Sequence, residues 1–436
     1  MTHDRRVVIT GLGLMTPLGL GADTFWGKLA GGESGVAPVQ LPEHHGIGSP
    51  GSVGGEVSDF TESAARKAQL KVLRKMVKVM CREIQLGAAS ALDAVMHSGL
   101  DLDAIAHERL GISFGANLMS SPPESLKAAA AACTKIEDGK KVFIEEDWAE
   151  KGLGAMQPLW LLRYLPNMPA CHIGIAIDAR GPNNSITLDE ASGNLAISEA
   201  MSIIQRNRAD MMIAGSTGTR VHPVKSAHAR LWWDLADSPD DPTKRCRPFE
   251  LNRAGEVVAE GATSFLLEEK SHADARGAKI WGEVLSTAGS CVLSKDGKPD
   301  MQQAMVIAMQ NALSRAQLQP GDIGHINAHG CGSQEVDRLE AAAIHEVFGD
   351  VASTVPVTAI KSYFGNAGSG CGPMELAASL MSLAEGHILP TLNYDAPDPA
   401  LNLNVVSGGQ LATDNKTFLK LNVTRMGQAS ASIITA

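Results

Sequence analysis

The residues most able to do chemistry stand together in the stretch NNSITLDEASGN, positions 183–194. Ser185–Leu188 has the short, β-branched character of a strand. From Ala191 onward the chain is apolar or small on almost every side, as a buried helix is. Asp189 and Glu190 therefore stand where a strand passes into a buried helix. The free N–H groups and partial positive charge of a helix N-terminus attract anions and oxyanions, so this junction is a candidate site.

Asp189 and Glu190 also have a purely structural explanation. An acid at this point often caps the helix, and a second acid in the first turn interacts favourably with the helix dipole. The local sequence alone favours this explanation, and the rest of the chain decides between the two.

Two motifs of other enzyme classes fail on their context. The glycines after the strand candidate Val7–Thr10 suggest a dinucleotide fingerprint, but Thr16 stands where its third glycine belongs. The run GISFG at 111–115 fits the nucleophile elbow of serine hydrolases, which requires a helix directly after the serine. The segment Ser120–Pro123 that follows indicates a loop instead, so neither motif is retained.

Composition narrows the class of protein. The chain has 436 residues, enough for a large core, and 44 glycines with few aromatic residues, which suits a tightly packed α/β protein. Its net charge of −10 argues against general nucleic-acid binding. Seven scattered cysteines without a CxxC pair favour a reducing compartment over disulfides or a metal site. No apolar run approaches a membrane span, and glycines, threonines and a proline interrupt the only signal-like segment, so we expect a cytoplasmic protein without membrane contact.

A basic cluster marks the segment from Ala64 to Leu100, which the sequence predicts to be helical. Its members are Arg66, Lys67, Lys71, Arg74, Lys75, Lys78 and Arg82. Such a cluster is most often a solvated helix face. In an acidic protein it is also a candidate docking surface for an acidic partner.

A second cycle of strands and helices begins near Lys279. The strand candidate 325–328 ends at His329, and Lys361 and Asn366 precede a glycine-rich turn and the predicted helix Met374–Glu385. No low-complexity linker separates this cycle from the first, so we expect the two halves to pack as one body.

The chain resembles the β-ketoacyl-[acyl-carrier-protein] synthases, the condensing enzymes of the thiolase fold. The resemblance covers nearly the whole chain and rests on RRVVITGLGLMTPLG, LPNM, RGPNNS, RPFELNRAGEVVAEGATSFLLEE and NAHGCGSQEVDRLEAAAIHEVFG. It implies an α/β fold, a thiolase-like five-layered α-β-α-β-α sandwich of two related halves. Residues 1–270 would form the half with the nucleophile-position helix, and residues 271–436 the half with His329 and Lys361. It also implies a homodimer, or a heterodimer with another ketosynthase, whose interface we expect to include Met211–Gly215.

The resemblance assigns the candidate site residue by residue. Glu190 stands at the position of the nucleophilic cysteine, His329 matches the first histidine, Asn366 replaces the second, and Lys361 matches the family lysine. The remaining positions are the supporting acids Asp337 and Glu340, the gating loop with Met426 and Gly427, and Cys331 and Ser333 where the family has hydroxyl residues for pantetheine contact. The backbone N–H groups of Glu190 and Met426 could form an oxyanion hole.

These replacements argue against ordinary condensation, because Glu190 cannot form a durable thioester equivalent and Asn366 cannot carry charge. The sequence favours a ketosynthase-like protein of fatty acid or polyketide biosynthesis that decarboxylates malonyl-carrier thioesters. One alternative is a non-catalytic partner subunit of an active ketosynthase, similar to a chain-length factor. Another is an acyltransferase that uses Cys331 or Cys371 as its nucleophile.

The implied partner is an acyl-carrier protein, whose phosphopantetheine carries the substrate, so the protein itself needs no cofactor and no metal. We expect this acidic carrier to dock at Arg66, Lys67, Lys71, Arg74 and Lys75. Burial would raise the pKa of the Glu190 carboxyl, whereas a helix N-terminus and a nearby cation would lower it. Decarboxylation would require neutral Glu190, since an ionised carboxylate repels the malonyl carboxylate.

Overall fold

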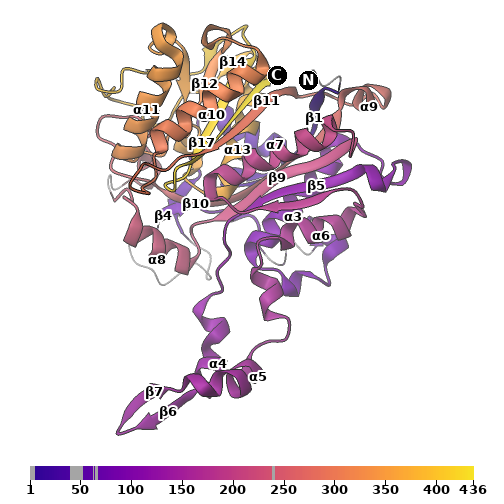
Figure 1. Ribbon diagram of the computed structural model, residues 1–436, viewed down its shortest axis with the longest axis vertical. Coiled ribbons are helices and arrows are strands. Elements are labelled where there is room, and N and C mark those ends of the chain that lie inside the picture. The colour runs from indigo at the N-terminus through magenta and orange to yellow at the C-terminus, as the bar shows by residue number, and fades with distance from the viewer. Residues whose placement is uncertain (1–4, 40–52, 62, 64–66, 238–240) are drawn as a thin grey trace.

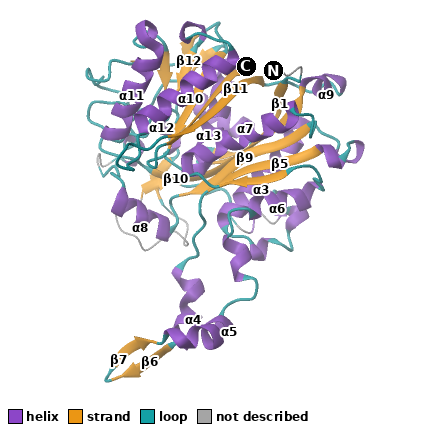
Figure 2. Cartoon of the chain, viewed as in Figure 1, coloured by secondary structure: helices purple, strands orange, loops and turns teal. Residues whose placement is uncertain are grey.

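The computed structural model describes residues 5–39, 53–61, 63, 67–237 and 241–436. Its main strands follow one hydrogen-bonded order, β15-β13-β12-β17-β18-β11-β1-β10-β9-β5-β8. The junction between β1 and β11 is short, because only Val8 and Ile9 pair across it, with Glu283 and Gly282. Two strongly twisted sheets therefore meet at this junction, as Figure 2 shows in orange.

The first sheet is built from five strands of the N-terminal half. They are β1 (Val7–Thr16), β5 (Leu110–Ala116), β8 (Asn183–Ile186), β9 (Met211–Thr219) and β10 (Val258–Glu269). β1, β10 and β9 pair antiparallel, whereas β9, β5 and β8 pair parallel. The parallel strands are the ones that lead into the helices around Glu190.

The second sheet repeats this arrangement. Its strands are β11 (Gly282–Cys291), β12 (His325–Asn327), β13 (Pro356–Thr358), β17 (Thr417–Val423) and β18 (Gln428–Thr435). β11, β18 and β17 pair antiparallel, whereas β17, β12 and β13 pair parallel. The strands of the two halves thus pair in the same succession of antiparallel and parallel orientations, so the two halves are structural repeats.

Helices cover both faces of each sheet. Helices α7 (Ser192–Gln205) and α13 (Cys371–Ala384) lie between the two sheets, and both are buried nearly all round (Figure 1). The outer faces are covered by α3 (Arg82–Ser98), α6 (Met168–Ile177), α10 (Met301–Ala316) and α11 (Gln334–Phe348). One apolar core fills the middle layer and one lies under each outer helix layer. This arrangement confirms the predicted five-layered sandwich.

The remaining elements are short. The helices are α1 (Ala22–Ala30), α8 (Pro223–Trp232), α9 (Lys270–Ala275) and α12 (Lys361–Phe364). The strands are β2 (Gly19–Leu20), β3 (Val36–Pro38), β4 (Val53–Gly55), β14 (His387–Ile388), β15 (Asn404–Val405) and β16 (Leu411–Ala412). Each helix in the described part of the chain is too short or too polar to cross a lipid bilayer.

An arm projects from the body between β5 and α6 (Figure 1). It is built from α4 (Lys127–Ala132), the hairpin β6 (Thr134–Glu137) and β7 (Lys140–Phe143), and α5 (Leu153–Ala155). Several large apolar side chains of this segment are exposed, namely Leu118, Ile136, Phe143, Leu153, Leu159 and Leu161. The arm thus presents apolar surface that the described chain leaves uncovered.

The predicted single helix from Ala64 to Leu100 is wrong in its first half. Residues 71–73 and 77–79 form 3-10 turns, and α3 begins only at Arg82. Successive turns bury Leu70, Leu73 and Val77 at a spacing that resembles helical periodicity. Arg82 leaves the basic cluster, because its guanidinium turns inward and pairs with Glu260 at 2.7 Å.

The predicted dimer interface at Met211–Gly215 is also wrong. These residues lie in β9, which is buried and pairs with β10 on one edge and β5 on the other. The strand at the end of the hydrogen-bonded order is β8, whose Asn183 and Asn184 are exposed. A sheet edge that can accept a further strand is therefore β8 rather than β9.

Candidate active site

Glu190 lies at the sharp turn between β8 and α7. The preceding residue, Asp189, has φ 46°, in the left-handed region that residues other than glycine rarely occupy. Asp189 and Glu190 open a single 3-10 turn that leads directly into α7. This turn directs the Glu190 side chain into the interior, where the residue is only 5% exposed. The predicted strand-to-helix junction is confirmed.

Glu190 is bound by two side chains that come from distant parts of the chain. Its Oε1 lies 2.7 Å from Nη2 of the buried Arg220 and accepts a second hydrogen bond from Nδ2 of Asn366 at 3.2 Å. Burial raises the pKa of the carboxyl, but the charge and hydrogen bonds of Arg220 and Asn366 outweigh it and hold the pKa below its usual value. Glu190 is therefore ionised at neutral pH, and the neutral form that decarboxylation would require is not the resting state.

Glu256 extends this arrangement to the gating loop. One of its oxygens accepts a hydrogen bond from Asn366 Nδ2 at 2.8 Å and lies 3.6 Å from Arg220 Nη1. The other accepts a hydrogen bond from Nη2 of Arg425 at 2.8 Å. We call Asp189, Glu190, Arg220, Glu256, Asn366 and Arg425 the ionic network. In it, three carboxylates face two guanidinium groups.

Arg220 is the centre of the ionic network. It follows β9 directly, and its Nη2 also lies 2.9 Å from Asp189. Its guanidinium carbon lies 3.9 Å from the ring centroid of Trp233, close enough for a cation–π contact. Burial alone would lower the pKa of Arg220, but the surrounding carboxylates raise it overall, so the side chain remains a cation.

One of the two backbone N–H groups expected to form an oxyanion hole has another acceptor. The Met426 N–H points to Oγ1 of Thr424 at 3.3 Å. Met426 and Gly427 form the turn between β17 and β18, where Gly427 adopts φ 73°. A developing oxyanion would have to displace the Thr424 hydroxyl from this N–H group.

His329 is held at the end of β12 by two acids of α11. Glu340 accepts the N–H groups of His329 and Gly330 at 2.6 and 2.8 Å. Asp337 accepts the N–H groups of Cys331 and Gly332 at 3.0 and 3.2 Å, and that of Phe249 at 2.8 Å. The acids predicted to support the histidine thus fix the backbone around it.

The ring of His329 faces a group of buried cations. Its Nδ1 lies 3.4 Å from Nζ of Lys361 and 3.4 Å from Nδ2 of Asn422. We call Lys361, Glu375 and Lys420 the lysine cluster, in which both ammonium groups bind Glu375, at 2.6 and 2.5 Å. Burial and these cations hold the pKa of His329 well below its usual value. The imidazole is therefore neutral, and the donors around Nδ1 place its proton on Nε2.

A cavity of about 690 Å³ opens onto Glu190. Its walls combine side chains from the arm base, α8 and the gating loop, and they include Leu118, Asp189, Glu190, Arg220, Val224, Lys225, His228, Trp232, Trp233, Arg425 and Met426. His329 and Asn366 are not among its lining residues, and neither are Lys361, Cys331 and Ser333. Of the predicted site residues, only Glu190 and Met426 therefore face this cavity.

The predicted alternative nucleophiles are inert in this environment. Cys331 and Cys371 are both buried. Burial raises the pKa of the Cys371 thiol to about 12 and that of Cys331 well above its usual value. Thiols of this kind carry no appreciable thiolate at neutral pH, so both behave as small core residues.

The basic surface predicted to bind a carrier protein is largely exposed. Lys67, Lys71, Arg74 and Lys75 all face solvent, and Arg66 lies outside the described residues. Val72 between them is 68% exposed, which adds an apolar contact point to the charges. This basic surface does not share a residue with the cavity.

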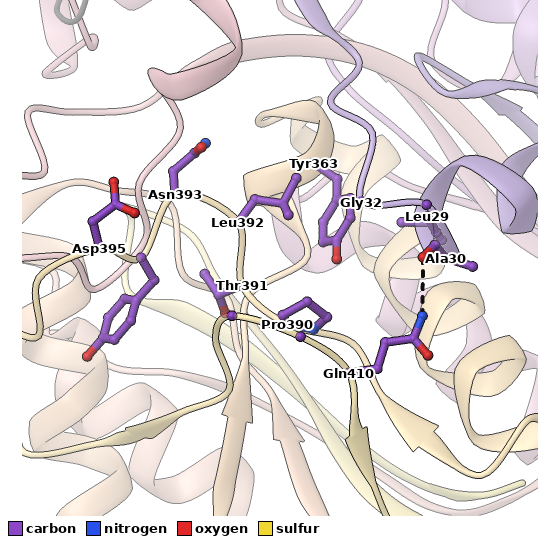
Figure 3. A pocket seen from close by; sticks show the side chains of 14 residues that line it. Leu29, Ala30, Gly32, Tyr363, Pro390, Thr391, Leu392, Asn393, Asp395 and Gln410 are labelled. Carbon is purple, nitrogen blue, oxygen red and sulfur yellow. Dashed lines mark hydrogen bonds between the residues drawn. The ribbon is translucent and has the colours of Figure 1, made fainter.

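A second cavity of about 430 Å³ lies elsewhere in the molecule. Figure 3 shows its lining, which includes Leu29 at the end of α1, Tyr363 and Gln410, whose Nε2 donates to the carbonyl of Ala30 at 3.3 Å. It contains no residue predicted for the site, so the candidate site is the cavity at Glu190.

The sequence did not reveal three of the charges that determine the site. Lys420 interrupts an apolar strand, which is a signal of a buried charge, whereas Arg220 follows a run of glycines and hydroxyl residues and Glu256 follows a polar turn. The signal identifies no partner, because the contacting residues are 30 or more positions away. Only the fold reveals that these charges neutralise one another.

Comparison with known proteins identifies the family. Residues 4–273 match the family described as "Beta-ketoacyl synthase, N-terminal domain", and residues 283–395 match "Beta-ketoacyl synthase, C-terminal domain". The tetracenomycin polyketide synthase ketoacyl synthase alpha subunit of Streptomyces glaucescens is 31% identical, over 92% of this chain and 90% of that protein. The 3-oxoacyl-[acyl-carrier-protein] synthase 2 of Synechocystis is 30% identical, over 93% of this chain and 91% of that protein.

The same relationship holds for solved structures. The beta-ketoacyl synthase of Burkholderia phymatum superposes with a TM-score of 0.84 at 25% identity, over 99% of both chains. The structural neighbours are ketosynthases of the thiolase-like fold, which the two related halves described above reproduce. The chain therefore belongs to the β-ketoacyl synthase family, the ketosynthases of fatty acid and polyketide biosynthesis.

Proposed function

We propose that this protein is a non-condensing ketosynthase homologue that acts as the partner subunit of an active ketosynthase, similar to a chain-length factor. The observation that carries this proposal is the buried ion pair of Glu190 and Arg220, at 2.7 Å, in the position of the nucleophile. A carboxylate held in this way is neither a nucleophile for an acyl thioester nor a neutral hydrogen-bond donor.

The geometry argues against malonyl decarboxylation, which the sequence favoured. The carboxylates of the ionic network outnumber its guanidinium groups, so the network offers no net attraction to a malonyl carboxylate. The N–H group of Met426 already has an acceptor, and His329 does not line the cavity. Two elements of that chemistry are thus not available to a ligand in the cavity.

The residues that persist have a structural role in this proposal. Lys361 donates to the carbonyl of His329 at 2.7 Å, and it shares Glu375 with Lys420. Removing Glu375 would leave both ammonium groups buried without their carboxylate, and breaking a buried ion pair in this way typically costs about 3–5 kcal/mol. Retention of His329 and Lys361 is therefore compatible with a subunit that performs no chemistry.

The proposed pairing surface combines the β8 edge with the arm. β8 offers unpaired backbone groups at the end of the first sheet, and the arm exposes large apolar side chains such as Phe143 and Leu153. Ketosynthases are the expected partners, and one relative is by name a single subunit of a polyketide synthase. A homodimer would place two rebuilt sites together, so we favour a heterodimer with a subunit that retains its cysteine.

An acyl-carrier protein is the second proposed partner. Another structural neighbour, 26% identical with a TM-score of 0.79 over 99% of both chains, is a ketosynthase in complex with the acyl-carrier protein of a type II synthase. The basic surface at Lys67, Lys71, Arg74 and Lys75 suits such an acidic carrier, which brings its own phosphopantetheine. The seven free cysteines fit a reducing compartment, and we place the protein in the cytoplasm.

Two measurements test the proposed function. Purified protein, free of other synthases, should release CO2 from malonyl-carrier protein no faster than a heat-treated sample does. The Glu190→Gln variant should also release CO2 no faster than that sample. Tagged protein expressed in its own host should co-purify in equal amounts with a ketosynthase whose cysteine reacts with iodoacetamide. Rapid CO2 release by the purified protein would overturn the proposal in favour of decarboxylation.

A further inference from the structure

Arg220 and Arg425 line the cavity and also act on His329. His329 does not line the cavity and is only 2% exposed. The charges of both arginines nevertheless contribute to lowering its pKa. The two guanidinium groups therefore face the space that a ligand can enter and lie near enough to the imidazole to influence it.

Glu256 is the residue that holds these two arginines together. It is 4% exposed and is contacted by Arg425 at 2.8 Å, by Asn366 at 2.8 Å and by Arg220 at 3.6 Å. Glu190 contacts Arg220 and Asn366, neither of which belongs to the gating loop. Glu256 is thus the link between the gating loop and the ionic network.

We propose that Glu256 is a positioning residue that closes an ionic barrier, formed with Arg220 and Arg425, between the cavity and His329. This inference rests on the proposed function, because it explains why a thioester in the cavity cannot reach the histidine. It goes further than the proposed function, because it assigns the closing of the barrier to Glu256, a side chain to which the family resemblance gave no role in the site.

The gating loop is the part of the barrier that can move. The Arg425 side chain is 26% exposed, whereas those of Arg220 and Glu256 are 3% and 4% exposed. Without the Glu256 carboxylate, Arg425 can turn toward solvent at little desolvation cost, while Arg220 keeps its pair with Glu190. Loss of Glu256 should therefore open the loop and leave the core intact.

Chemical modification of histidines tests this barrier without any assay of activity. Diethyl pyrocarbonate acylates neutral imidazole, and peptide mapping then gives a rate for each histidine. His329 reports passage through the barrier, and the exposed His228, which lines the cavity, reports access to the cavity itself. His325 is buried in β12 and reports loosening of the second sheet.

Two variants and a matched control complete the experiment. Glu256→Gln keeps the size of the side chain but removes its charge, and Arg425→Ala removes the loop side of the barrier. Glu268→Gln is the control, because Glu268 is a buried glutamate that Arg276 and His272 contact at a distance from the cavity.

We expect His329 to react at least about tenfold faster in Glu256→Gln and in Arg425→Ala than in the wild type. His228 and His325 should keep their rates, and Glu268→Gln should change none of them. The proposal is overturned if His329 reacts as fast as His228 in the wild type, or if His329 and His325 accelerate together. A wild type that decarboxylates malonyl-carrier protein would refute the proposed function, whereas the histidine rates would still report on the barrier.

Discussion

Two buried charge clusters lie in the candidate site, and they differ in what they face. Four members of the ionic network line the cavity, namely Asp189, Glu190, Arg220 and Arg425. The lysine cluster lies beside His329, away from the cavity lining, and contains Lys361. In the function that we propose, the side of the site around Glu190 is rebuilt, whereas the side that holds the histidine is kept.

If the proposed function is right, this difference is how a buried site loses its chemistry without losing its fold. The carboxylates of the ionic network have partners within it, so that Glu190 is paired with Arg220, and Glu256 with Arg425. In the lysine cluster, loss of Glu375 would leave two ammonium groups unpaired in the interior, which is strongly destabilising. Sites of this kind therefore change where charge can be rebalanced and persist where it cannot.

The largest expected effect is condensation activity when the residues around Glu190 are changed to those that the family resemblance expects. Glu190→Cys alone should remain inactive, because Asn366 still replaces a histidine. Adding Asn366→His should raise the rate by about 10²-fold or more, the usual contribution of a positioned acid–base group. Arg220→Ala should raise it further, since an arginine against the new thiolate hinders its attack. Condensation of acyl- with malonyl-carrier protein measures this series, and full activity of Glu190→Cys alone would disprove the roles given to Asn366 and Arg220.

Changes in the lysine cluster should instead lower the free energy of unfolding. Glu375→Leu leaves Lys361 and Lys420 buried without their shared carboxylate, and we expect a loss of about 3–5 kcal/mol in the free energy of unfolding. Glu199→Leu is the control, because its ion pair with Arg206 is solvent-exposed and should change stability by less than about 0.5 kcal/mol. Urea unfolding of both variants decides the matter, and equal losses would remove the structural role of the lysine cluster.

The sequence predicted more of the surroundings of His329 than of the surroundings of Glu190. His329 and the acids Asp337 and Glu340 lie together in the structure, because the segment NAHGCGSQEVDRLE is local and continuous. Lys361 reaches His329 from a separate segment. Arg220 was missed, because its contact with Glu190 forms between the start of one helix and the end of a strand 30 residues later. Such pairings depend on side-chain directions that only the folded chain defines.

The fold was predictable to a similar extent. The five-layered sandwich was predicted from the family resemblance, whereas the residue pattern itself predicted the buried helix that became α7 and the helix that became α13. The segment before Arg82 was misjudged, because successive 3-10 turns bury residues at nearly the same spacing as an α-helix. The interface was misplaced at β9, because an apolar strand indicates burial without saying whether another chain or this one covers it.

A smaller effect is expected at the basic surface. This surface shares no residue with the cavity, so changes there test the docking of a carrier protein apart from the candidate site. Reversing the charges of Arg74 and Lys75 to glutamate should weaken binding of an acyl-carrier protein about tenfold at low salt, and less as salt rises. The same reversal at the exposed Lys295 and Lys298 is the control. Calorimetric titration gives the affinities, and unchanged binding after the first reversal would exclude this surface as the docking site.

The smallest effect concerns the charge of Glu190. Its pKa is held below the ordinary value of 4.5, so its ionised form stabilises the fold above that pH, and this contribution is lost as pH falls through the lowered pKa. The stability advantage of the wild type over Glu190→Gln should therefore be constant near neutrality and shrink in acid. An advantage that instead grows below pH 4.5 would indicate that Glu190 is neutral when folded.

The central claim is that position 190 holds one half of a buried ion pair in place of a nucleophile. A double-mutant cycle of Glu190→Gln and Arg220→Met, followed by urea unfolding, measures that pair directly. We predict a coupling free energy of at least about 2 kcal/mol, because each single change takes from the other buried charge its nearest ionic partner, at 2.7 Å. A coupling below about 0.5 kcal/mol, the range of exposed ion pairs, would contradict the claim.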